Sequence, residues 1–135
     1  MLLDDAYNAN PSSMRASLAV MRSAKSSRKI AVLGDMKELG EFGERYHREL
    51  GEAIGSSGFD LVYWFGDAAG HVHSGMEKAG GTCAFRAFTD LEALIADVTG
   101  EIRPGDAVLV KGSHACRLDR VVSAVRMMIK DAGRT

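Results

Sequence analysis

No stretch of the sequence is apolar for long enough to cross a membrane, and neither sign of charge is in marked excess. The 135 residues include 17 Lys and Arg against 18 Asp and Glu, so the formal net charge is -1 at pH 7. A membrane helix needs roughly 18 unbroken apolar residues, and nucleic acids and anionic membranes attract basic surfaces. We therefore expect a soluble protein that binds neither membranes nor nucleic acid, with any phosphate recognition confined to a local site.

Cysteine is also scarce. The chain has two, Cys83 and Cys116, which lie far apart and form no CxxC pattern. Small secreted domains use several cysteines as a disulfide framework, and a secretion signal has a basic segment followed by an apolar run. This chain begins with an acidic segment instead. The sequence therefore predicts reduced thiols and a cytoplasmic location.

Common catalytic motifs are missing as well. The chain contains no GxxxxGK[ST] phosphate loop, and "KGS" at 111–113 is not one. His71 and His73 would point away from each other on a helix, so we expect no metal site there. Cys116 beside His114 lacks a third, orienting group, which argues against a nucleophile and its base. We therefore predict no catalytic residue and no metal ligand in this chain.

The chain does contain five short apolar runs that alternate with five segments of helical periodicity. This alternation predicts a single α/β domain over residues 1–135, a Rossmann-like three-layer sandwich. We expect a mostly parallel sheet of five or six strands with helices on both faces, because three of the runs are continuous and rich in Val, Ile or Leu. The expected strands lie at about 2–5, 29–34, 60–66, 83–88 and 106–112.

Capping residues and apolar spacing locate the helices. Asn10 is a strong N-cap and Pro11 suits the first helical position, so the first helix should begin there. Gly70 and Gly75 lower the propensity of the third helix, near 68–79. Thr89 and Glu92 can form a capping box at the start of the fourth. The expected buried residues are Met14, Leu18 and Met21 in the first helix, Phe42, Tyr46, Leu50 and Ile54 in the second, Leu91, Leu94, Ile95 and Val98 in the fourth, and Leu118, Val121, Val122, Val125 and Ile129 in the fifth.

Polar and glycine-rich segments follow four of the strands. They are "DDAYNANP" after the first, "GDMKELGEFG" after the second, "GDAAG" after the third and "KGSHACR" after the fifth. In an open α/β sheet, ligands bind outside the carboxyl ends of the strands, where loops and helix N-termini gather. We therefore expect the binding site at this edge of the sheet.

The first of these segments offers groups that suit a nucleotide. Asp5 can accept hydrogen bonds from a ribose or from backbone amides, while Tyr7, Asn8 and Asn10 offer a ring face and amide groups to a base. A simpler interpretation also holds, with Asn10 as a helix cap and Asn8 as a turn residue. Asp4 and Asp5 are a poor acid–base pair, because neighbouring residues of a strand point in opposite directions.

Two further segments offer charge. Lys111 lies directly after an apolar strand, and Gly112 and Ser113 lead from it toward a helix. Its ammonium group can therefore meet a phosphate or a carboxylate at the helix N-terminus. Taken alone, it is equally well explained as a structural lysine. Asp35, Lys37 and Glu38 can meet a charged substrate, although a solvated loop accounts for them nearly as well.

Three motifs resemble one family. "DDAYNANPSSM", "VLGDMKELGE" and "VLVKGSHACRLDRVV" are similar, in this order and over nearly the whole chain, to the carboxyl-terminal domain of the Mur ligases. Within that family, the motifs specifically resemble the member that joins D-alanyl-D-alanine to UDP-N-acetylmuramoyl-tripeptide. The resemblance implies an ATP-dependent amide ligation through an acyl phosphate, with Mg²⁺ neutralising the phosphates.

In that family the phosphate loop and most metal ligands lie in a central domain, and an amino-terminal domain holds the UDP-sugar. Both are missing here, so the resemblance implies an excised or fragmentary domain that is inactive alone and acts on ATP and both substrates only with the missing domains. It also implies roles for eight residues. Asp5, Tyr7, Asn8 and Asn10 would reach the nucleotide on domain closure, and Asp35, Glu38, Lys111 and Ser113 would border the dipeptide.

The last motif departs from the family pattern. His114 stands where an arginine commonly follows "KGS", and Cys116 stands where methionine is common, whereas Arg117 keeps its place. Two alternatives remain. One is a freestanding, non-catalytic α/β binding module. The other is the matching domain of a related ligase such as folylpolyglutamate synthetase, whose corresponding segment resembles Asp-Gly-Ala-His-Asn-Pro rather than "DDAYNANP".

Overall fold

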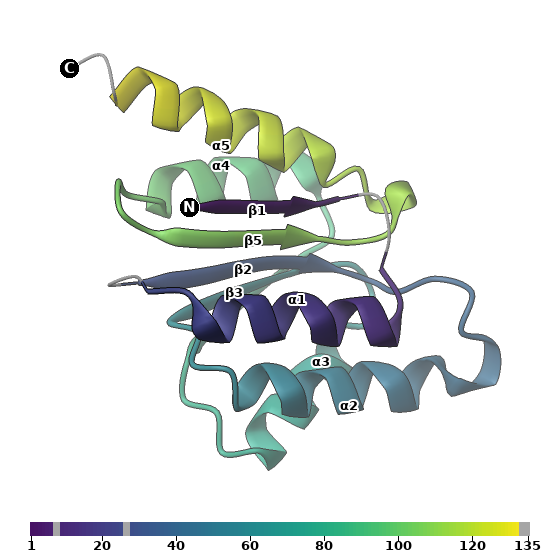
Figure 1. The fold of residues 1–135 in the computed structure, drawn as a ribbon. Helices are drawn as coiled ribbons and strands as arrows, with labels where there is room; N and C mark the ends of the chain where they lie inside the picture. The colour runs from purple at the N-terminus through teal and green to yellow at the C-terminus, as the bar shows by residue number, and fades with distance from the viewer. Residues whose placement is uncertain (7–8, 26–27, 133–135) are drawn as a thin grey trace.

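A five-stranded parallel sheet forms the centre of the molecule in the computed structural model, which describes residues 1–6, 9–25 and 28–132. The strand order is β1-β5-β2-β3-β4, so the last strand of the chain is inserted between the first and the second (Figure 1). This confirms the predicted α/β class and parallel sheet. The strands are β1 (Leu2–Asp5), β2 (Lys29–Gly34), β3 (Leu61–Phe65), β4 (Ala84–Phe88) and β5 (Ala107–Lys111).

Helices cover both faces of the sheet, which completes the three layers (Figure 1). Two short 3-10 turns, η1 (Gly40–Phe42) and η2 (His114–Cys116), precede α2 and α5. One face carries α1 (Pro11–Ser23), α2 (Gly43–Gly55) and α3 (Ala69–Lys78), and the other carries α4 (Leu91–Glu101) and α5 (Asp119–Ala132).

Alternate residues of each central strand enter two separate cores. In β2, Ala31 and Leu33 pack beneath α1 and α2, whereas Ile30 and Val32 pack beneath α4 and α5. All four are fully buried, as expected for a strand covered on both faces.

The first helix begins as predicted. The Asn10 side chain accepts a hydrogen bond from the Ser13 amide at 2.9 Å, and the Ser13 hydroxyl accepts one from the Asn10 amide at 3.0 Å. With Pro11 at the first position, this reciprocal box satisfies the donors at the helix start. The expected buried stripe of Met14, Leu18 and Met21 is confirmed.

The predicted stripe of α2 is wrong at its first residue. Phe42 lies in the preceding 3-10 turn and is 47% exposed, whereas His47, Leu50 and Ile54 are buried. Because an α-helix has 3.6 residues per turn, a four-residue step rotates by about 40° each time. Three such steps carry Phe42 away from the face that Ile54 occupies.

Two more details differ from prediction. Asp90, not Thr89, caps α4, because its carboxylate accepts the Glu92 amide at 3.0 Å. Ile129 of α5 is 49% exposed, since the last turns of α5 extend past the sheet (Figure 1). The other predicted residues of α5, Leu118, Val121, Val122 and Val125, are buried.

The third helix forms where predicted, and one of its glycines allows it to pack closely against α2. A Cβ on Gly75 would clash with the Arg48 carbonyl oxygen, and one on Gly51 would clash with that of Val72. The backbones of α2 and α3 therefore touch at these two glycines. By contrast, a Cβ on Gly70 would meet open space.

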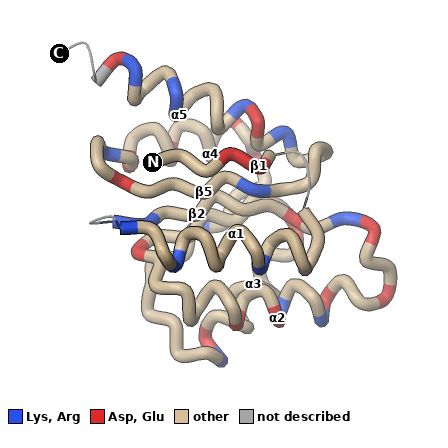
Figure 2. The backbone as a smooth tube through the Cα atoms, in the orientation of Figure 1, with Lys and Arg blue, Asp and Glu red and all other residues tan. Residues whose placement is uncertain are grey.

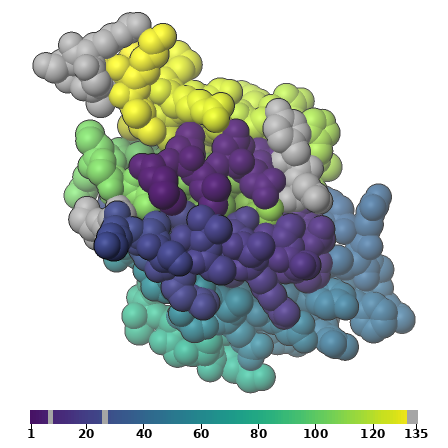
Figure 3. Space-filling model, viewed as in Figure 1, coloured from purple at the N-terminus to yellow at the C-terminus, as the bar shows by residue number. Residues whose placement is uncertain are grey.

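The surface fits the balanced composition. Acidic and basic residues alternate along the outer helices and loops, without a large region of one sign on this side (Figure 2). The edge strand β1 reaches the surface between α1 and α5 (Figure 3). Among the described residues, no helix is both long and apolar enough to cross a membrane.

Candidate functional site

The topology creates a crevice at the carboxyl ends of β5 and β2. The chain leaves β2 toward α2 on one face and leaves β5 toward α5 on the other, so the two loops diverge above neighbouring strands (Figure 1). Such switch points are where open α/β sheets bind ligands. The segments predicted to carry chemistry after β2 and β5 therefore lie together.

A cavity of about 220 Å³ opens at this edge. Loops after four of the five strands contribute to it, and its wall is a mixture of charged, polar and small side chains. The lining residues are Asp35, Lys37, Phe65, Gly66, Asp67, Thr89, Ala115 and Cys116.

The carboxylate of Asp35 accepts hydrogen bonds from three N–H groups of the protein. Trp64 Nε1 donates to Oδ1 at 2.8 Å, the Ala68 amide donates to the same oxygen at 3.1 Å, and the Asp67 amide donates to Oδ2 at 2.9 Å. Gly66, with φ of 128°, leaves space for this carboxylate that a Cβ would fill. Asp35 therefore joins β2 to the start of α3, and its predicted contact with substrate is limited to the edge that lines the cavity.

Lys111 and Asp5 form an ion pair across β5 and β1, where they are register partners. The Lys111 side chain is 0% exposed and that of Asp5 is 43% exposed. The structure thus joins one residue of the predicted nucleotide set to one of the predicted dipeptide set. Lys111 is accordingly not a solvent-facing cation, and Asp5 is the exposed member of the pair.

The remaining predicted site residues are less constrained. Asn10 is at the same edge with its side-chain oxygen used as the α1 cap. Glu38 is exposed and has a left-handed φ of 60°, and Ser113 Oγ lies 3.4 Å from Cys116 Sγ. Tyr7 and Asn8 lie outside the described residues.

Before they diverge, the loops after β5 and β2 are in contact at Cys116 and Asp35. The Cys116 thiol, which is buried, lies 3.7 Å from the Asp35 carbonyl oxygen as a donor. Arg117 adopts a left-handed φ of 57° and donates to the Asp119 carboxylate at 3.2 Å. The Arg117 guanidinium holds the pKa of Asp119 below its usual value.

Sequence reasoning missed His47, which lies on α2 behind the cavity and is 5% exposed. Its Nε2 accepts the Met36 amide at 3.0 Å, and its ring packs edge-on against Trp64 with centroids 5.7 Å apart. The missed signal is its spacing, because His47, Leu50 and Ile54 follow the helical three-and-four pattern of a buried face.

Comparison with known proteins identifies the family. The family described as "Mur ligase, glutamate ligase domain" matches residues 1–114. The chain belongs to the Mur ligase family. The matching part of that family is its carboxyl-terminal domain, as the three sequence motifs predicted.

Relatives in the family are ligases. The chain is 32% identical over 122 residues to the UDP-N-acetylmuramoyl-tripeptide–D-alanyl-D-alanine ligase of Bacillus subtilis, covering 90% of this chain and 27% of the relative. It is 36% identical over 128 residues to the Escherichia coli ligase of the same name, covering 93% and 27%. The chain therefore spans about a quarter of the length of these relatives.

Solved structures agree. The MurF ligase of Thermotoga maritima in complex with ADP superposes with a TM-score of 0.74 at 30% identity, covering 97% of this chain and 29% of that one. A MurF structure from Acinetobacter baumannii gives a TM-score of 0.77 at 27% identity, covering 90% and 27%. The structural similarity covers 97% and 90% of this chain in the two comparisons.

The described residues of this Mur ligase domain contain no cluster of three or more His, Cys, Asp or Glu side chains that would hold a metal ion. Asp35 already accepts three N–H groups and Asp5 is paired with Lys111. The carboxylates described at this edge thus do not fit a Mg²⁺ site on their own.

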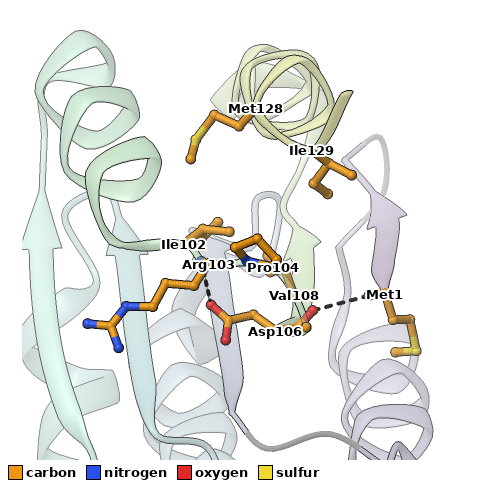
Figure 4. A pocket seen from close by; sticks show the side chains of 9 residues that line it. Met1, Ile102, Arg103, Pro104, Asp106, Val108, Met128 and Ile129 are labelled. Carbon is orange, nitrogen blue, oxygen red and sulfur yellow. Dashed lines mark hydrogen bonds between the residues drawn. The ribbon is translucent and has the colours of Figure 1, made fainter. Parts of the chain in front are cut away.

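A larger pocket of about 300 Å³ lies at the opposite edge, near the amino ends of β5 and β1 (Figure 4). Met128 and Ile129 of α5 face Ile102 and Pro104 across it (Figure 4). Its wall is mainly apolar, and none of the predicted site residues lines it. The cavity at the carboxyl edge is therefore the candidate site of this Mur ligase domain.

Proposed function

We propose that this chain is the closing and substrate-binding domain of an ATP-dependent ligase that adds D-alanyl-D-alanine to UDP-N-acetylmuramoyl-tripeptide in peptidoglycan synthesis. The observation that carries the proposal is the cavity at the switch point, which loops after β2, β3, β4 and β5 line together. The similarity to ligases of that name supports the substrate assignment.

The cavity suits the dipeptide. Pockets for drug-sized ligands measure about 300–1,000 Å³, so a cavity of about 220 Å³ favours a smaller molecule. Lys37, whose side chain is 53% exposed and whose Nζ lies 3.9 Å from Asp35 Oδ2, lines the cavity and can also pair with the dipeptide carboxylate. Asp67 and Thr89, on neighbouring loops, offer oxygens to its amine. Glu38 and Ser113 border this region as further proposed contacts.

The nucleotide would lie nearer to β1. The exposed Asp5, held by Lys111, and the residues Tyr7, Asn8 and Asn10 form this proposed part. The ADP complex of the Thermotoga maritima relative supports the use of an adenine nucleotide. Mg²⁺ in the whole ligase would neutralise phosphate charge. Since the carboxylates described here do not form a site for it, we assign its ligands, like the phosphate loop and the UDP-sugar site, to other domains.

Closure of this domain would shield the reaction. An acyl phosphate reacts with water unless the site excludes it, and lids commonly provide that exclusion. A domain that holds only one wall of the site has no means of enclosing the intermediate. We accordingly infer that the chain alone is inactive. The two free cysteines, Cys83 and Cys116, support a ligase that works in the cytoplasm.

The test compares two proteins. The 135-residue chain and the longer ligase containing it are each incubated with ATP, Mg²⁺, tripeptide precursor and D-alanyl-D-alanine, and the product is measured by mass spectrometry. We expect product from the longer protein alone. Product from the isolated chain would overturn the closing role, and no product from the longer protein would favour a non-catalytic binding module.

A further inference from the structure

One buried titratable group lies directly behind the cavity without lining it, the imidazole of His47 on α2. The Met36 amide donates to its Nε2 at 3.0 Å, and its Nδ1 lies 2.7 Å from the Gly43 carbonyl oxygen. A ring nitrogen that accepts a hydrogen bond carries no proton, so the proton lies on Nδ1 and is donated to Gly43. The hydrogen bonds therefore define a neutral ring in one tautomer.

The same ring contacts the cavity wall by a second route. It packs edge-on against Trp64, with ring planes at 85°, and Trp64 Nε1 donates to Asp35 at 2.8 Å. His47 thus holds Met36 directly and supports Asp35 through Trp64. Asp35 and Met36 are neighbouring residues at the start of the loop that follows β2.

That loop needs support from inside the molecule. After Met36, Lys37 and Glu38 are exposed to solvent, and Glu38 has a left-handed φ of 60°. A residue with a side chain keeps such a conformation only where its surroundings hold it. The buried Met36 amide is hydrogen-bonded to His47 immediately before Lys37, so this bond fixes the backbone from which the Lys37 side chain extends.

We propose that His47 is a positioning residue for the dipeptide: as a neutral imidazole it fixes the loop after β2 so that Asp35 and Lys37 form one wall of the cavity. The identity of the dipeptide rests on the proposed ligase function. A purely structural histidine would lower stability and leave substrate affinity unchanged. A positioning histidine changes the KM for the dipeptide while sparing ATP.

The first experiment examines the 135-residue chain by ¹⁵N NMR. We expect the proton of His47 on Nδ1 at pH 7, and we expect the Met36 amide to exchange with solvent far more slowly than the Lys37 amide. A proton on Nε2, or a Met36 amide that exchanges as fast as that of Lys37, would overturn the proposal. This measurement needs no substrate and no variant.

The second experiment uses the longer ligase with His47→Phe, which keeps a ring against Trp64 and removes both polar atoms. We expect the KM for D-alanyl-D-alanine to rise about tenfold, as the loss of one buried hydrogen bond allows, while the KM for ATP changes less than twofold. His47→Gln, whose amide oxygen can accept the Met36 N–H, should recover most of the affinity. His71→Phe, on the exposed side of α3, is the matched control and should behave as the parent.

The outcomes separate the two proposals. An unchanged dipeptide KM in both His47 variants, or an equal rise in the KM values for both substrates, would overturn the positioning role. Absence of product from the parent ligase would instead overturn the proposed function, and the NMR result would still decide whether His47 holds the loop. If His47→Phe does not fold, His47→Gln and the NMR measurement decide the question.

Discussion

At the scale of single residues, the site edge depends on side chains that make several hydrogen bonds at once. Asp35 accepts three N–H groups from the segment 64–68, and hydrogen bonds to a charged group each contribute about 1.5–3 kcal/mol. A carboxamide cannot accept all of these donors. We expect Asp35→Asn to lower the free energy of unfolding by about 2–3 kcal/mol, measured by urea denaturation with fluorescence of the single Trp64.

Asp67→Asn is the control for this prediction. Asp67 lines the same cavity and is exposed, and surface substitutions usually change stability by about 0.5 kcal/mol or less. Equal effects of the two substitutions would show that charge at this edge, not the hydrogen bonds of Asp35, stabilises the fold.

The pair of Lys111 and Asp5 predicts an asymmetry. Removing one partner of an ion pair costs about 3–5 kcal/mol when the charge left behind is buried and unpaired, whereas a charge left in contact with solvent stays hydrated. Lys111 is the fully buried member, and the side chain of Asp5 is 43% exposed. Asp5→Ala should therefore destabilise the chain by about 3 kcal/mol and Lys111→Met by less than about 1 kcal/mol, measured by urea denaturation. The opposite order would mean that the Lys111 ammonium is stable in its site without Asp5.

A buried carboxylate at the other edge predicts acid sensitivity. Burial opposes ionisation of Asp106, but hydrogen bonds from Arg28 and the Arg103 amide outweigh it and lower its pKa. A carboxyl whose pKa is lower in the folded state contributes stability above its unfolded pKa of about 3.9, and this is lost as pH falls through the lower folded pKa. The unfolding free energy from pH 5 to 2 should therefore fall less steeply in Asp106→Asn than in the parent. Parallel curves would exclude Asp106 as a source of the acid sensitivity.

At the scale of elements, the contact of α2 with α3 depends on glycine in a way that propensity alone misjudges. Gly51 and Gly75 have no space for a Cβ, whereas Gly70 has open space. Gly75→Ala should destabilise the fold by about 2 kcal/mol or more through overpacking. Gly70→Ala should stabilise it by about 0.5–1 kcal/mol through helix propensity. Thermal unfolding followed by circular dichroism measures both, and effects of the same sign would contradict the packing argument.

The same elements show what sequence patterns can predict. Strand positions agree within one residue at each end, because apolar runs bounded by Gly, Asp and Lys are local signals. The cap of α1 is equally local. The stripe of α2 failed at Phe42, and His47 was missed, because a buried polar residue is recognised only once its partners Met36 and Gly43 are placed.

At the scale of the whole molecule, strand order was beyond the sequence analysis. Periodicity shows that a strand is buried on both faces and says nothing of its neighbours, and the insertion of β5 between β1 and β2 is a long-range fact. The pairing of Lys111 with Asp5, and the approach of Cys116 to Asp35, follow from that insertion. Sequence reasoning could therefore name site segments but could not place them against one another.

This topology makes the last strand essential to the sheet. Because β5 pairs with both β1 and β2, a chain ending at residue 105 would leave β1 without a partner and a central row of backbone groups unpaired, which is costly when buried. We expect residues 1–105 to lack a cooperative unfolding transition by circular dichroism and by Trp64 fluorescence.

The matched control is a chain that ends at residue 129 and keeps most of α5. It should keep the transition, because the buried residues of that helix, from Leu118 to Val125, are retained. A cooperative transition in residues 1–105 would show that β1 and β2 can pair without β5, and the crevice above β5 and β2 would then not depend on completion of the sheet.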